Sequence, residues 1–223
     1  MKKIKNVIFS VVDSLLRNLS GGIGEKIRYF WYKYFRLKKC GENVRIKESV
    51  YIYNPENVSI GNNVVIMAFA LIDAPNIDQT KYNFQKENIN RNYHIDKPEI
   101  FIGNEVQIGA YNIISGLGGI IINDQVTLSA RVSLYSSSHL TNMPENKGLI
   151  TSANTMAYSK PAPSIKSPLV IFQNAWLGIN VLMFRGTVGE NSFIKPNSVI
   201  LSDIPRNSRA EGNPAISIGK RFF

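Results

Sequence analysis

The chain has 223 residues, of which 44% are hydrophobic and 19% are charged. This composition is that of a globular protein with a buried core, and it excludes a disordered chain, a collagen and a coiled coil. The single cysteine, Cys40, excludes an internal disulfide framework and a cysteine-based zinc site. The net charge is +10, but residues 1–40 carry most of it, with ten basic and two acidic residues. A basic surface spread over the fold is therefore absent, and we expect no nucleic-acid partner.

The N-terminal segment, residues 1–40, is predicted to form two amphipathic helices. Apolar residues recur at spacings of three and four over residues 4–19 and again over residues 23–35, with two glycines between the stripes. Asp13 interrupts the first stripe and no small-residue cleavage site follows it, so we expect no signal peptide. No apolar run reaches the roughly 18 residues of a membrane span. We expect both stripes to pack on the body and cap its first coil, and docking on a membrane surface is the alternative.

From residue 41 onward an aliphatic residue recurs every six positions. The series comprises Ile46 and Ile52; Ile60, Ile66 and Ile72; Ile102, Ile108 and Ile114; Ile122, Leu128 and Leu134; Ile171, Leu177 and Met183; and Val188, Ile194 and Ile200. A short strand and a bend take six residues, and three such units return the chain to its starting direction, so the coils stack around an apolar column. Glycine and asparagine after the aliphatic residue suit bends with positive φ. Strands of a β-sandwich recur every roughly 8–12 residues, so the step of six favours an all-β solenoid.

The repeat has interruptions, and they are as informative as the repeat itself. The step is eight from Ile52 to Ile60 and from Ile114 to Ile122, and residues 73–99 and 135–170 break the pattern completely. Long loops on a rigid scaffold are common places for function, so we expect residues 73–99 and 140–170 of these inserts to decide the acceptor. The predicted organisation is a helical segment over residues 1–40, a β-helix over residues 41–205 and a tail over residues 206–223.

The C-terminal motifs resemble those of a known family. Residues 174–181 read Asn-Ala-Trp-Leu-Gly-Ile-Asn-Val, similar to an N-x-W-I-G-x-x-V signature, and residues 188–191 read Val-Gly-Glu-Asn. Ser-Val-Ile at 198–200, Asp-Ile-Pro at 203–205 and Gly-Asn-Pro-Ala at 212–215 follow in order. Together they resemble the hexapeptide-repeat acyltransferases, in the sugar O-acetyltransferase branch, over about residues 41–220.

The resemblance implies a fold, an assembly and a reaction. Members of the family fold as a left-handed parallel β-helix and assemble as homotrimers with active sites between neighbouring subunits. The handedness comes from the resemblance alone, because it is an exception to the right-handed crossover rule. Members transfer an acetyl group from acetyl-CoA, without a metal, to a hydroxyl or an amine.

His139 is the expected catalytic residue. A sugar hydroxyl attacks a thioester only as its proton is removed, and histidine is the only side chain whose ordinary pKa lies near neutrality. His139 follows the Leu134 hexad in Leu-Tyr-Ser-Ser-Ser-His, where the family's catalytic histidine stands. His94 lies in an insert with no matching motif. Many relatives have an acidic residue after the histidine, but here it is Leu140, so the group that orients the imidazole is open: a backbone carbonyl or a carboxylate such as Asp73.

Other site residues follow from the resemblance. Asn112 matches an asparagine that meets the acceptor or the intermediate, with a corner asparagine as the alternative, and Tyr111 precedes it. Trp176 is expected under the acetyl-CoA arm or the acceptor, or at a subunit interface. The residues expected to hold acetyl-CoA are Gly178, Ile179, Lys195, Pro196, Ser202, Arg206, Arg209 and Lys220, although the basic ones have the alternative of being ordinary surface charges. By register Asn112 and His139 fall at different corners of one subunit, so a site that uses both needs two subunits.

The predicted function is acetyl-CoA-dependent O-acetylation of a sugar hydroxyl. The expected acceptor is a bacterial cell-surface polysaccharide, such as a capsule or a lipopolysaccharide, or its precursor. The alternatives are N-acetylation of a nucleotide-linked amino sugar, O-acetylation of a small soluble sugar, and a non-catalytic trimeric scaffold. A trimeric zinc enzyme of the carbonic-anhydrase type needs three histidines, and the chain has two. We expect a cytoplasmic protein with peripheral contact at the inner face of the membrane.

Overall fold

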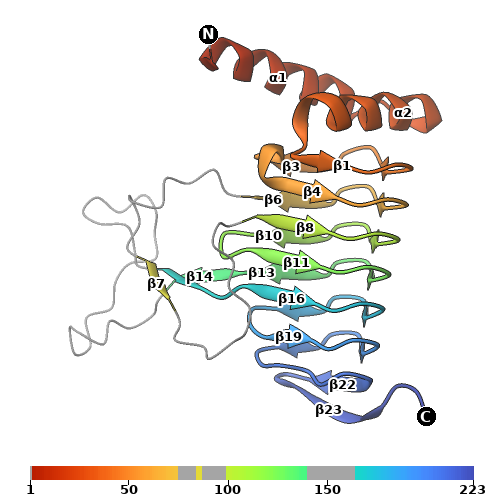
Figure 1. The fold of residues 1–223 in the computed structure, drawn as a ribbon, viewed down its shortest axis with the longest axis vertical. Helices are drawn as coiled ribbons and strands as arrows, with labels where there is room; N and C mark the ends of the chain where they lie inside the picture. The colour runs from red at the N-terminus through yellow and green to blue at the C-terminus, as the bar shows by residue number, and fades with distance from the viewer. Residues whose placement is uncertain (1, 75–83, 87–98, 140–163) are drawn as a thin grey trace.

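The structure is a stack of β-strand coils with two helices across its N-terminal end (Figure 1). This computed structural model describes residues 2–74, 84–86, 99–139 and 164–223. Helix α1 (Lys2–Arg17), helix α2 (Gly21–Trp31) and a π-helical turn, η1 (Tyr32–Arg36), precede the first strand. The two ends of the chain lie at opposite ends of the stack (Figure 1).

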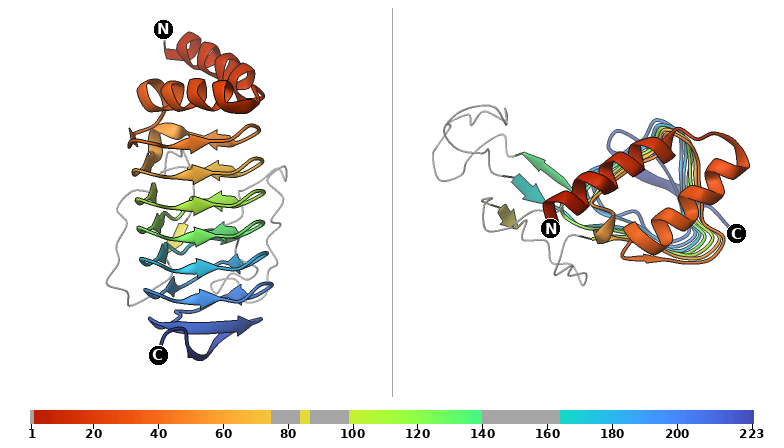
Figure 2. Two further views of the ribbon diagram at one scale, coloured as in Figure 1. Left: turned by 90° about the vertical axis from the view of Figure 1, so that its right-hand side faces the viewer. Right: turned by 90° about the horizontal axis from the view of Figure 1, so that it is seen from above.

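Three parallel sheets form the faces of the stack, which is a three-sided prism when seen from above (Figure 2). Face A contains β1 (Lys39–Cys40), β4 (Val58–Ile60), β8 (Ile100–Ile102), β11 (Ile120–Ile122), β16 (Leu169–Ile171) and β19 (Thr187–Val188). Face B contains β2 (Arg45–Ile46), β5 (Val65–Ile66), β9 (Gln107–Ile108), β12 (Thr127–Leu128), β17 (Trp176–Leu177), β20 (Phe193–Ile194) and β22 (Ser208–Gly212). Face C contains β3 (Tyr51–Tyr53), β6 (Leu71–Asp73), β10 (Ile113–Ser115), β13 (Ser133–Tyr135), β18 (Leu182–Met183) and β21 (Val199–Ile200). The predicted solenoid is confirmed, and the segment expected as a tail adds β22 and an antiparallel strand, β23 (Ala215–Lys220), to face B.

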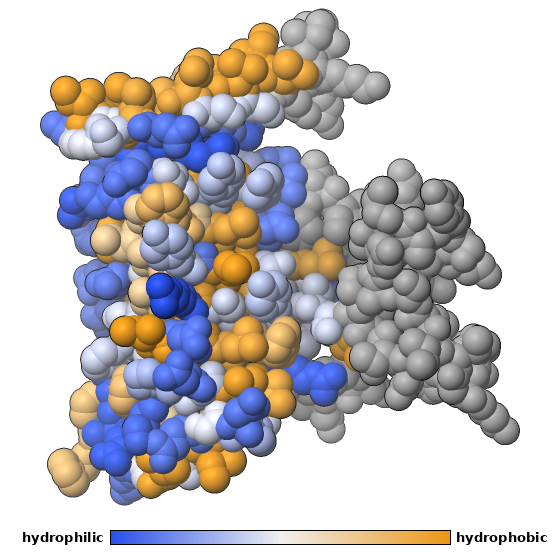
Figure 3. Space-filling model, turned by 180° about the vertical axis from the view of Figure 1, so that it is seen from behind, coloured by the Kyte–Doolittle hydropathy of each residue, from blue (hydrophilic) through white to orange (hydrophobic). Residues whose placement is uncertain are grey.

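The two helices cover the first coil, but they do so with polar groups. Arg28 of α2 is buried, and its guanidinium donates to the carbonyl oxygens of Leu16 (3.0 Å) and Ile46 (2.9 Å), which ties both helices to face B. Asp13 of α1 is also buried and accepts hydrogen bonds from Arg36 (2.8 and 3.1 Å). The expectation that the two apolar stripes pack on the body is wrong: most of their side chains are exposed, and apolar residues line the outer edge of the helices (Figure 3). The polar faces pack inward because Arg28 donates to carbonyls at the C-terminal end of α1, which have no hydrogen-bond partner within the helix.

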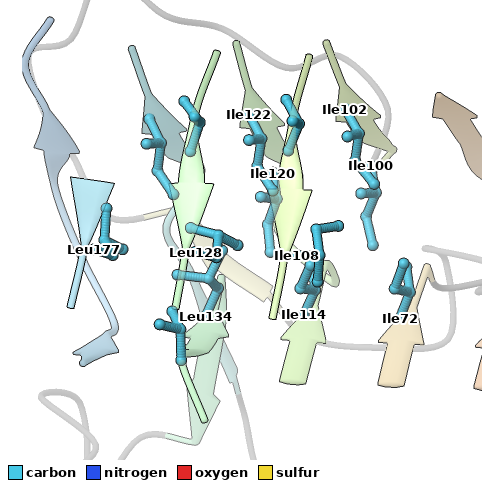
Figure 4. Packing of buried hydrophobic residues seen from close by; sticks show 14 of the residues in the cluster. Ile72, Ile100, Ile102, Ile108, Ile114, Ile120, Ile122, Leu128, Leu134 and Leu177 are labelled. Atoms are coloured by element: carbon cyan, nitrogen blue, oxygen red, sulfur yellow. The ribbon is translucent and has the colours of Figure 1, made fainter. Parts of the chain in front are cut away.

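The apolar column runs through the whole stack. Every aliphatic residue of the six-residue series is buried. A second buried residue lies two positions earlier in most units, because alternate residues of a strand point to the same side. Ile100 and Ile102 therefore both enter the column from β8, as Ile120 and Ile122 do from β11 (Figure 4). Burying one such side chain contributes about 1.5–3 kcal/mol, so the column is the main source of stability.

Two corners of the prism repeat regularly from coil to coil. The AB corner, between faces A and B, has one left-handed residue per coil; these are Asn43, Asn63, Glu105, Gln125, Asn174, Asn191 and Asn207. The BC corner, between faces B and C, has another such series: Ser49, Phe69, Tyr111, Arg131, Asn180 and Asn197. The residues with positive φ at these two corners are therefore mostly not glycines.

The glycine after the aliphatic residue has a different role from the expected one. A Cβ atom on Gly61 would lie 2.7 Å from the backbone of Gly103 in the next coil, so close stacking, and not positive φ, requires the glycine. The next residues form a ladder: the Asn62 N–H donates to Asn104 Oδ1 (2.9 Å), and the Asn104 N–H donates to Asp124 Oδ1 (2.7 Å). Amide and carboxylate side chains thus join successive coils at the AB corner.

The third corner, between faces C and A, contains all the departures from the step of six. This CA corner includes the 3₁₀ turn η2 (Pro55–Asn57), both eight-residue steps and the five-residue step from Met183 to Val188. Both inserts also leave here, between β6 and β8 and between β13 and β16. The topology therefore brings two segments that are distant in the sequence to one edge of the prism.

Candidate functional site at the CA corner

His139 lies on an arm that leaves the CA corner. β14 (Ser137–His139) pairs in antiparallel fashion with β15 (Ser164–Lys166), and His139 is opposite Ser164. β15 also pairs in parallel with β7 (Phe84–Lys86) of the first insert, so the arm is a three-stranded sheet made by both inserts. The sequence predicts loops here, because three-residue strands give no periodic signal. His94 and Leu140 lie outside the described residues.

Small polar groups fix the base of the arm. Ser136 is fully buried; its Oγ donates to the Ser115 carbonyl oxygen (3.0 Å) and accepts from the Gly118 N–H (2.8 Å). The Ser167 N–H donates to the Ser136 carbonyl oxygen (2.8 Å). Ser136 is three residues before His139, and Ser167 follows β15, so both strands of the arm are anchored at one point.

Asp73 ends β6 at the same corner. Its Cα is paired with Ser115 of β10, which is paired in turn with Tyr135 of β13, directly before the arm. Partial burial raises the pKa of the Asp73 carboxyl above its ordinary value. Asp73 thus lies on the correct face for a group that orients His139, and the orienting role stays a prediction.

Asn112 lies inside the prism at the BC corner. Its side chain is fully buried, and its Oδ1 accepts a hydrogen bond from the Val132 N–H (2.7 Å). It occupies the column position that Ala70 and Val132 fill in the neighbouring coils, two residues before the aliphatic residue. Asn112 therefore has the geometry expected for an asparagine that shapes a corner of the solenoid, which was the alternative interpretation. A contact between Asn112 and the acceptor stays a prediction. As the register indicates, the two residues belong to different corners of one protomer: Asn112 to the BC corner and His139 to the arm at the CA corner.

Tyr111 and Trp176 present exposed rings. Tyr111 is 54% exposed at the BC corner, and its ring stacks on that of Phe69 at 5.0 Å. Trp176 is 43% exposed on face B, where its Nε1 donates to Ser129 Oγ (2.9 Å) and its ring lies 4.8 Å from that of Phe193. Both rings are held in place by neighbours and leave one side open to a ligand or another subunit.

Four of the eight residues expected at acetyl-CoA gather at one place. Gly178 and Ile179 follow β17, and Lys195 and Pro196 follow the adjacent strand β20, so all four lie at the BC corner of two adjacent coils. A Cβ atom on Gly178 would lie 2.8 Å from the Ile194 carbonyl oxygen, so glycine is needed for stacking. Ile179 is exposed, and Lys195 forms an ion pair with Glu211.

The other four expected residues lie outside the BC corner. Ser202 is at the CA corner and Arg206 is at the AB corner of the last coil. Arg209 is on β22 and Lys220 is on β23, and all four are exposed. Because β22 pairs with β20, Arg209 lies opposite Phe193 and close to Lys195, whereas Ser202 and Arg206 lie at other corners of the protomer. Among the described residues no three histidine, cysteine, aspartate or glutamate side chains gather as metal ligands.

Two curated proteins are similar to the chain in sequence. A dTDP-4-amino-4,6-dideoxy-D-glucose acyltransferase of Escherichia coli is 32% identical over 102 residues, which are 46% of this chain and 42% of that protein. A putative lipopolysaccharide biosynthesis O-acetyl transferase, WbbJ, of Escherichia coli strain K12 is 28% identical over 126 residues, which are 54% of this chain and 60% of that protein. The chain thus spans about half the length of the curated relatives it matches. No protein-family model matches it.

The fold is also found in solved structures. AntD, an N-acyltransferase from Bacillus cereus, was crystallised with dTDP and 3-hydroxybutyryl-CoA; it superposes with a TM-score of 0.64 at 20% identity, covering 91% of this chain and 90% of that one. The chain is therefore similar in sequence to sugar acyltransferases, and it has the left-handed parallel β-helix fold of the hexapeptide-repeat acyltransferases.

Proposed function

We propose that the protein transfers the acetyl group of acetyl-CoA to a sugar hydroxyl of a bacterial cell-surface polysaccharide or its precursor. One observation carries the proposal: the sequence relatives are sugar acyltransferases, while a structural neighbour of the same fold holds an acyl-CoA. In the reaction, the sugar oxygen bonds to the acetyl carbon and the carbon–sulfur bond breaks. The hydroxyl proton leaves the oxygen, and CoA departs as a thiol.

His139 is the proposed general base. Its imidazole takes the hydroxyl proton during the attack and passes it to the departing thiolate, so no covalent enzyme intermediate is needed. Support comes from its position in β14, an edge strand of the three-stranded sheet that both inserts form; these inserts are the proposed acceptor determinants. A backbone carbonyl or Asp73 is the proposed orienting group.

Acetyl-CoA is proposed to bind along the BC corner. The exposed Ile179 and the backbone around Gly178 and Pro196 offer an edge for the pantetheine arm. Lys195, Arg206, Arg209 and Lys220 supply cations for the phosphates. Ser202 is included as a further contact.

A homotrimer is proposed because one protomer separates the parts of the site. The BC corner carries Tyr111, Asn112 and the acetyl-CoA residues near Gly178, and Trp176 lies on the adjacent face B, whereas His139 leaves the CA corner. Neighbouring subunits that put a BC corner beside a CA corner would complete the site, and the exposed rings of Tyr111 and Trp176 suit such an interface. Sedimentation equilibrium should give three times the chain mass, and a stable monomer with full activity would refute the shared site.

N-acetylation of a nucleotide-linked amino sugar is the second candidate. The Escherichia coli relative acts on a dTDP-linked amino sugar by its name, and AntD was crystallised with dTDP. O-acetylation of a small soluble sugar is covered by the same test. The product distinguishes the reactions, because mild alkali hydrolyses an acetyl ester and leaves an acetamide intact.

The test supplies labelled acetyl-CoA with a panel of glycans, nucleotide-linked amino sugars and small sugars. The proposal expects labelled glycan that loses its label in mild alkali, with release of one CoA thiol per acetyl group. The thiol of Cys40 adds little background, because burial raises its pKa to about 11. His139→Ala should lower turnover by at least about 10²-fold while CoA still binds. His94→Ala is the matched control, and equal turnover of the two variants would end the general-base role.

Peripheral contact with the inner face of the membrane, through residues 1–40, is part of the proposal, with the remainder of the protein in the cytoplasm. None of the described helices is long and apolar enough to cross a bilayer. Support comes from the exposed apolar side chains of α1 and α2.

A further inference from the structure

The helical cap has its apolar side turned away from the protein. Eight large apolar side chains of the cap are between 41% and 78% exposed. We call this set the cap face: Val7, Ile8, Val11, Leu15, Leu19, Ile23, Ile27 and Phe30. On α1, Val7, Ile8, Val11 and Leu15 fall within an arc of roughly 100°, opposite the buried Asp13. A helix that packs only on its own protein buries its apolar arc, so the cap face lacks its partner.

The cap face has cations near it and no available carboxylate. The only acidic residues of segment 1–40 are Asp13, which accepts from Arg36, and Glu25, which pairs with Arg45 and Lys47 (2.5 Å each). Both carboxylates are therefore used on the side that faces the β-helix.

The basic residues of segment 1–40 include some that are buried or paired with a carboxylate and others that are exposed. Arg28 is buried, and Lys33 and Arg36 have carboxylate partners. Lys26 is exposed on α2, and three further lysines occupy positions 2, 3 and 5 at the start of α1. Because several basic residues are buried or paired, the exposed positive charge of the cap is smaller than the sequence total suggests.

The two helices lie across the end of the prism (Figure 1, Figure 2). Their apolar side chains follow the outermost edge of the molecule (Figure 3). Helices with one apolar side, a basic polar flank and insufficient length to span a bilayer are suited to lie in the plane of a membrane interface.

From these observations, and deepening the peripheral contact proposed above, we infer that the cap face inserts into the interface of an anionic bilayer. α1 and α2 then lie in the membrane plane, and the β-helix extends from the surface with its arm and BC corner in water. Apolar burial supplies most of the affinity, and Lys26 with the N-terminal lysines adds a smaller attraction to anionic headgroups. A second copy of the chain is a poorer occupant, because two cap faces in contact would oppose like charges with no acidic residue to compensate them.

The test measures co-sedimentation of the full-length protein with phosphatidylcholine vesicles, with and without phosphatidylglycerol. The double variant Val11→Glu/Leu15→Glu places two charges on the cap face at exposed positions, so the fold should be kept. The matched control, Ile216→Glu/Ile218→Glu, makes the same change at exposed positions of β23, at the opposite end of the prism. Circular dichroism checks folding, and acetyl transfer to a water-soluble acceptor checks the site.

We expect binding to both vesicle types, stronger with phosphatidylglycerol. The partition coefficient should fall at least about tenfold in the cap variant and remain unchanged in the control. Lys26→Glu should weaken only the binding that depends on phosphatidylglycerol. Equal partitioning of the cap variant and the control would overturn the inference, as would self-association of the wild type that the cap variant abolishes. Either result leaves the acetyl-transfer proposal intact, because transfer to the soluble acceptor is measured in the same preparations.

Discussion

A single methyl group added at Gly118 should displace the base of the arm relative to the prism. The Cβ atom of an alanine there would lie 2.2 Å from the Ser136 carbonyl oxygen and 3.2 Å from the Ser167 nitrogen. Ordinary contact begins at about 3.4 Å, so the backbone at the base of the arm must move by about 1 Å. Because both obstructing atoms belong to the backbone, no side-chain rotation can relieve the contact.

Movement of the base of the arm should displace His139 and lower the rate of acetyl transfer. Ser136 precedes His139 by three residues, and Ser167 closes the other strand of the arm through its hydrogen bond to Ser136 (2.8 Å). A misplacement of about 1 Å at a reacting group can lower the rate by about 10²-fold. Overpacking of this kind also costs about 1–3 kcal/mol of stability. We therefore expect Gly118→Ala to lower kcat by about 10–100-fold with a moderate loss of stability.

Gly61→Ala is the control that separates the two effects. A Cβ atom on Gly61 would lie 2.7 Å from the Gly103 backbone, a comparable contact at the AB corner and away from the arm. Chemical denaturation measures the free energy of unfolding of each variant, and steady-state acetyl transfer measures kcat. Both variants should lose stability, and only Gly118→Ala should lose kcat. If the two variants lost kcat equally, the arm would not be what positions the histidine.

Two further substitutions probe the cap. Arg28→Met keeps the apolar stem but removes the donors to the Leu16 and Ile46 carbonyls, so we expect α1 and α2 to lose about 3 kcal/mol of local stability. Hydrogen exchange should then show faster exchange of the amides in both helices, whereas the control Lys26→Met, on the same helix, should have little effect. Burial alone raises the pKa of Glu25, but hydrogen bonds and charges from its two basic partners on β2 and directly after it lower that pKa on balance. The stabilisation is present at neutral pH and is lost as the pH falls through the lowered pKa, so the unfolding free energies of wild type and Glu25→Gln should differ by about 1 kcal/mol near neutrality and converge in acid.

The repeat could be read from the sequence because its physical cause is local. A six-residue step fixes which side chain of each strand faces inward, and Ile102 and its equivalents are all buried as predicted. The second inward position was missed although it has its own pattern, two residues before the first. Reading that pattern identifies Asn112 as a polar member of the column, beside Val132 in the next coil.

The arm and the cap could not be read in this way. The strands β7 and β15 are three residues long and join segments about eighty residues apart, so no local signal specifies their pairing. In the cap, the apolar stripe correctly predicted helices but not which side packs inward. That choice depends on carbonyl groups at the end of α1 and on β2, which Arg28 reaches only in the folded chain.

The candidate site lies at the CA corner because hydrogen bonds between coils fix the number of residues at the regular corners. Insertion of two residues at each kind of corner tests this explanation. At the AB corner each coil is joined to the previous one by a backbone hydrogen bond, such as Asn63 N–H to the Glu42 carbonyl (2.9 Å), and by the side-chain ladder, in which the Glu42 N–H donates to Asn62 Oδ1 (2.8 Å). Two residues inserted between Asn62 and Asn63 should break these contacts and cost about 3 kcal/mol or more. The same Gly-Ser pair inserted between Leu201 and Ser202, which are exposed at the CA corner, should cost less than the AB insertion. The contacts disturbed there are the close approach of Gly186 to Ser202 and the hydrogen bond from Thr187 N–H to Asp203 (2.8 Å), and added loop length costs little closure entropy. Denaturation midpoints compare the two insertions directly. If the AB insertion were tolerated as well as the CA insertion, corner geometry would not explain why the histidine arm leaves the prism where it does.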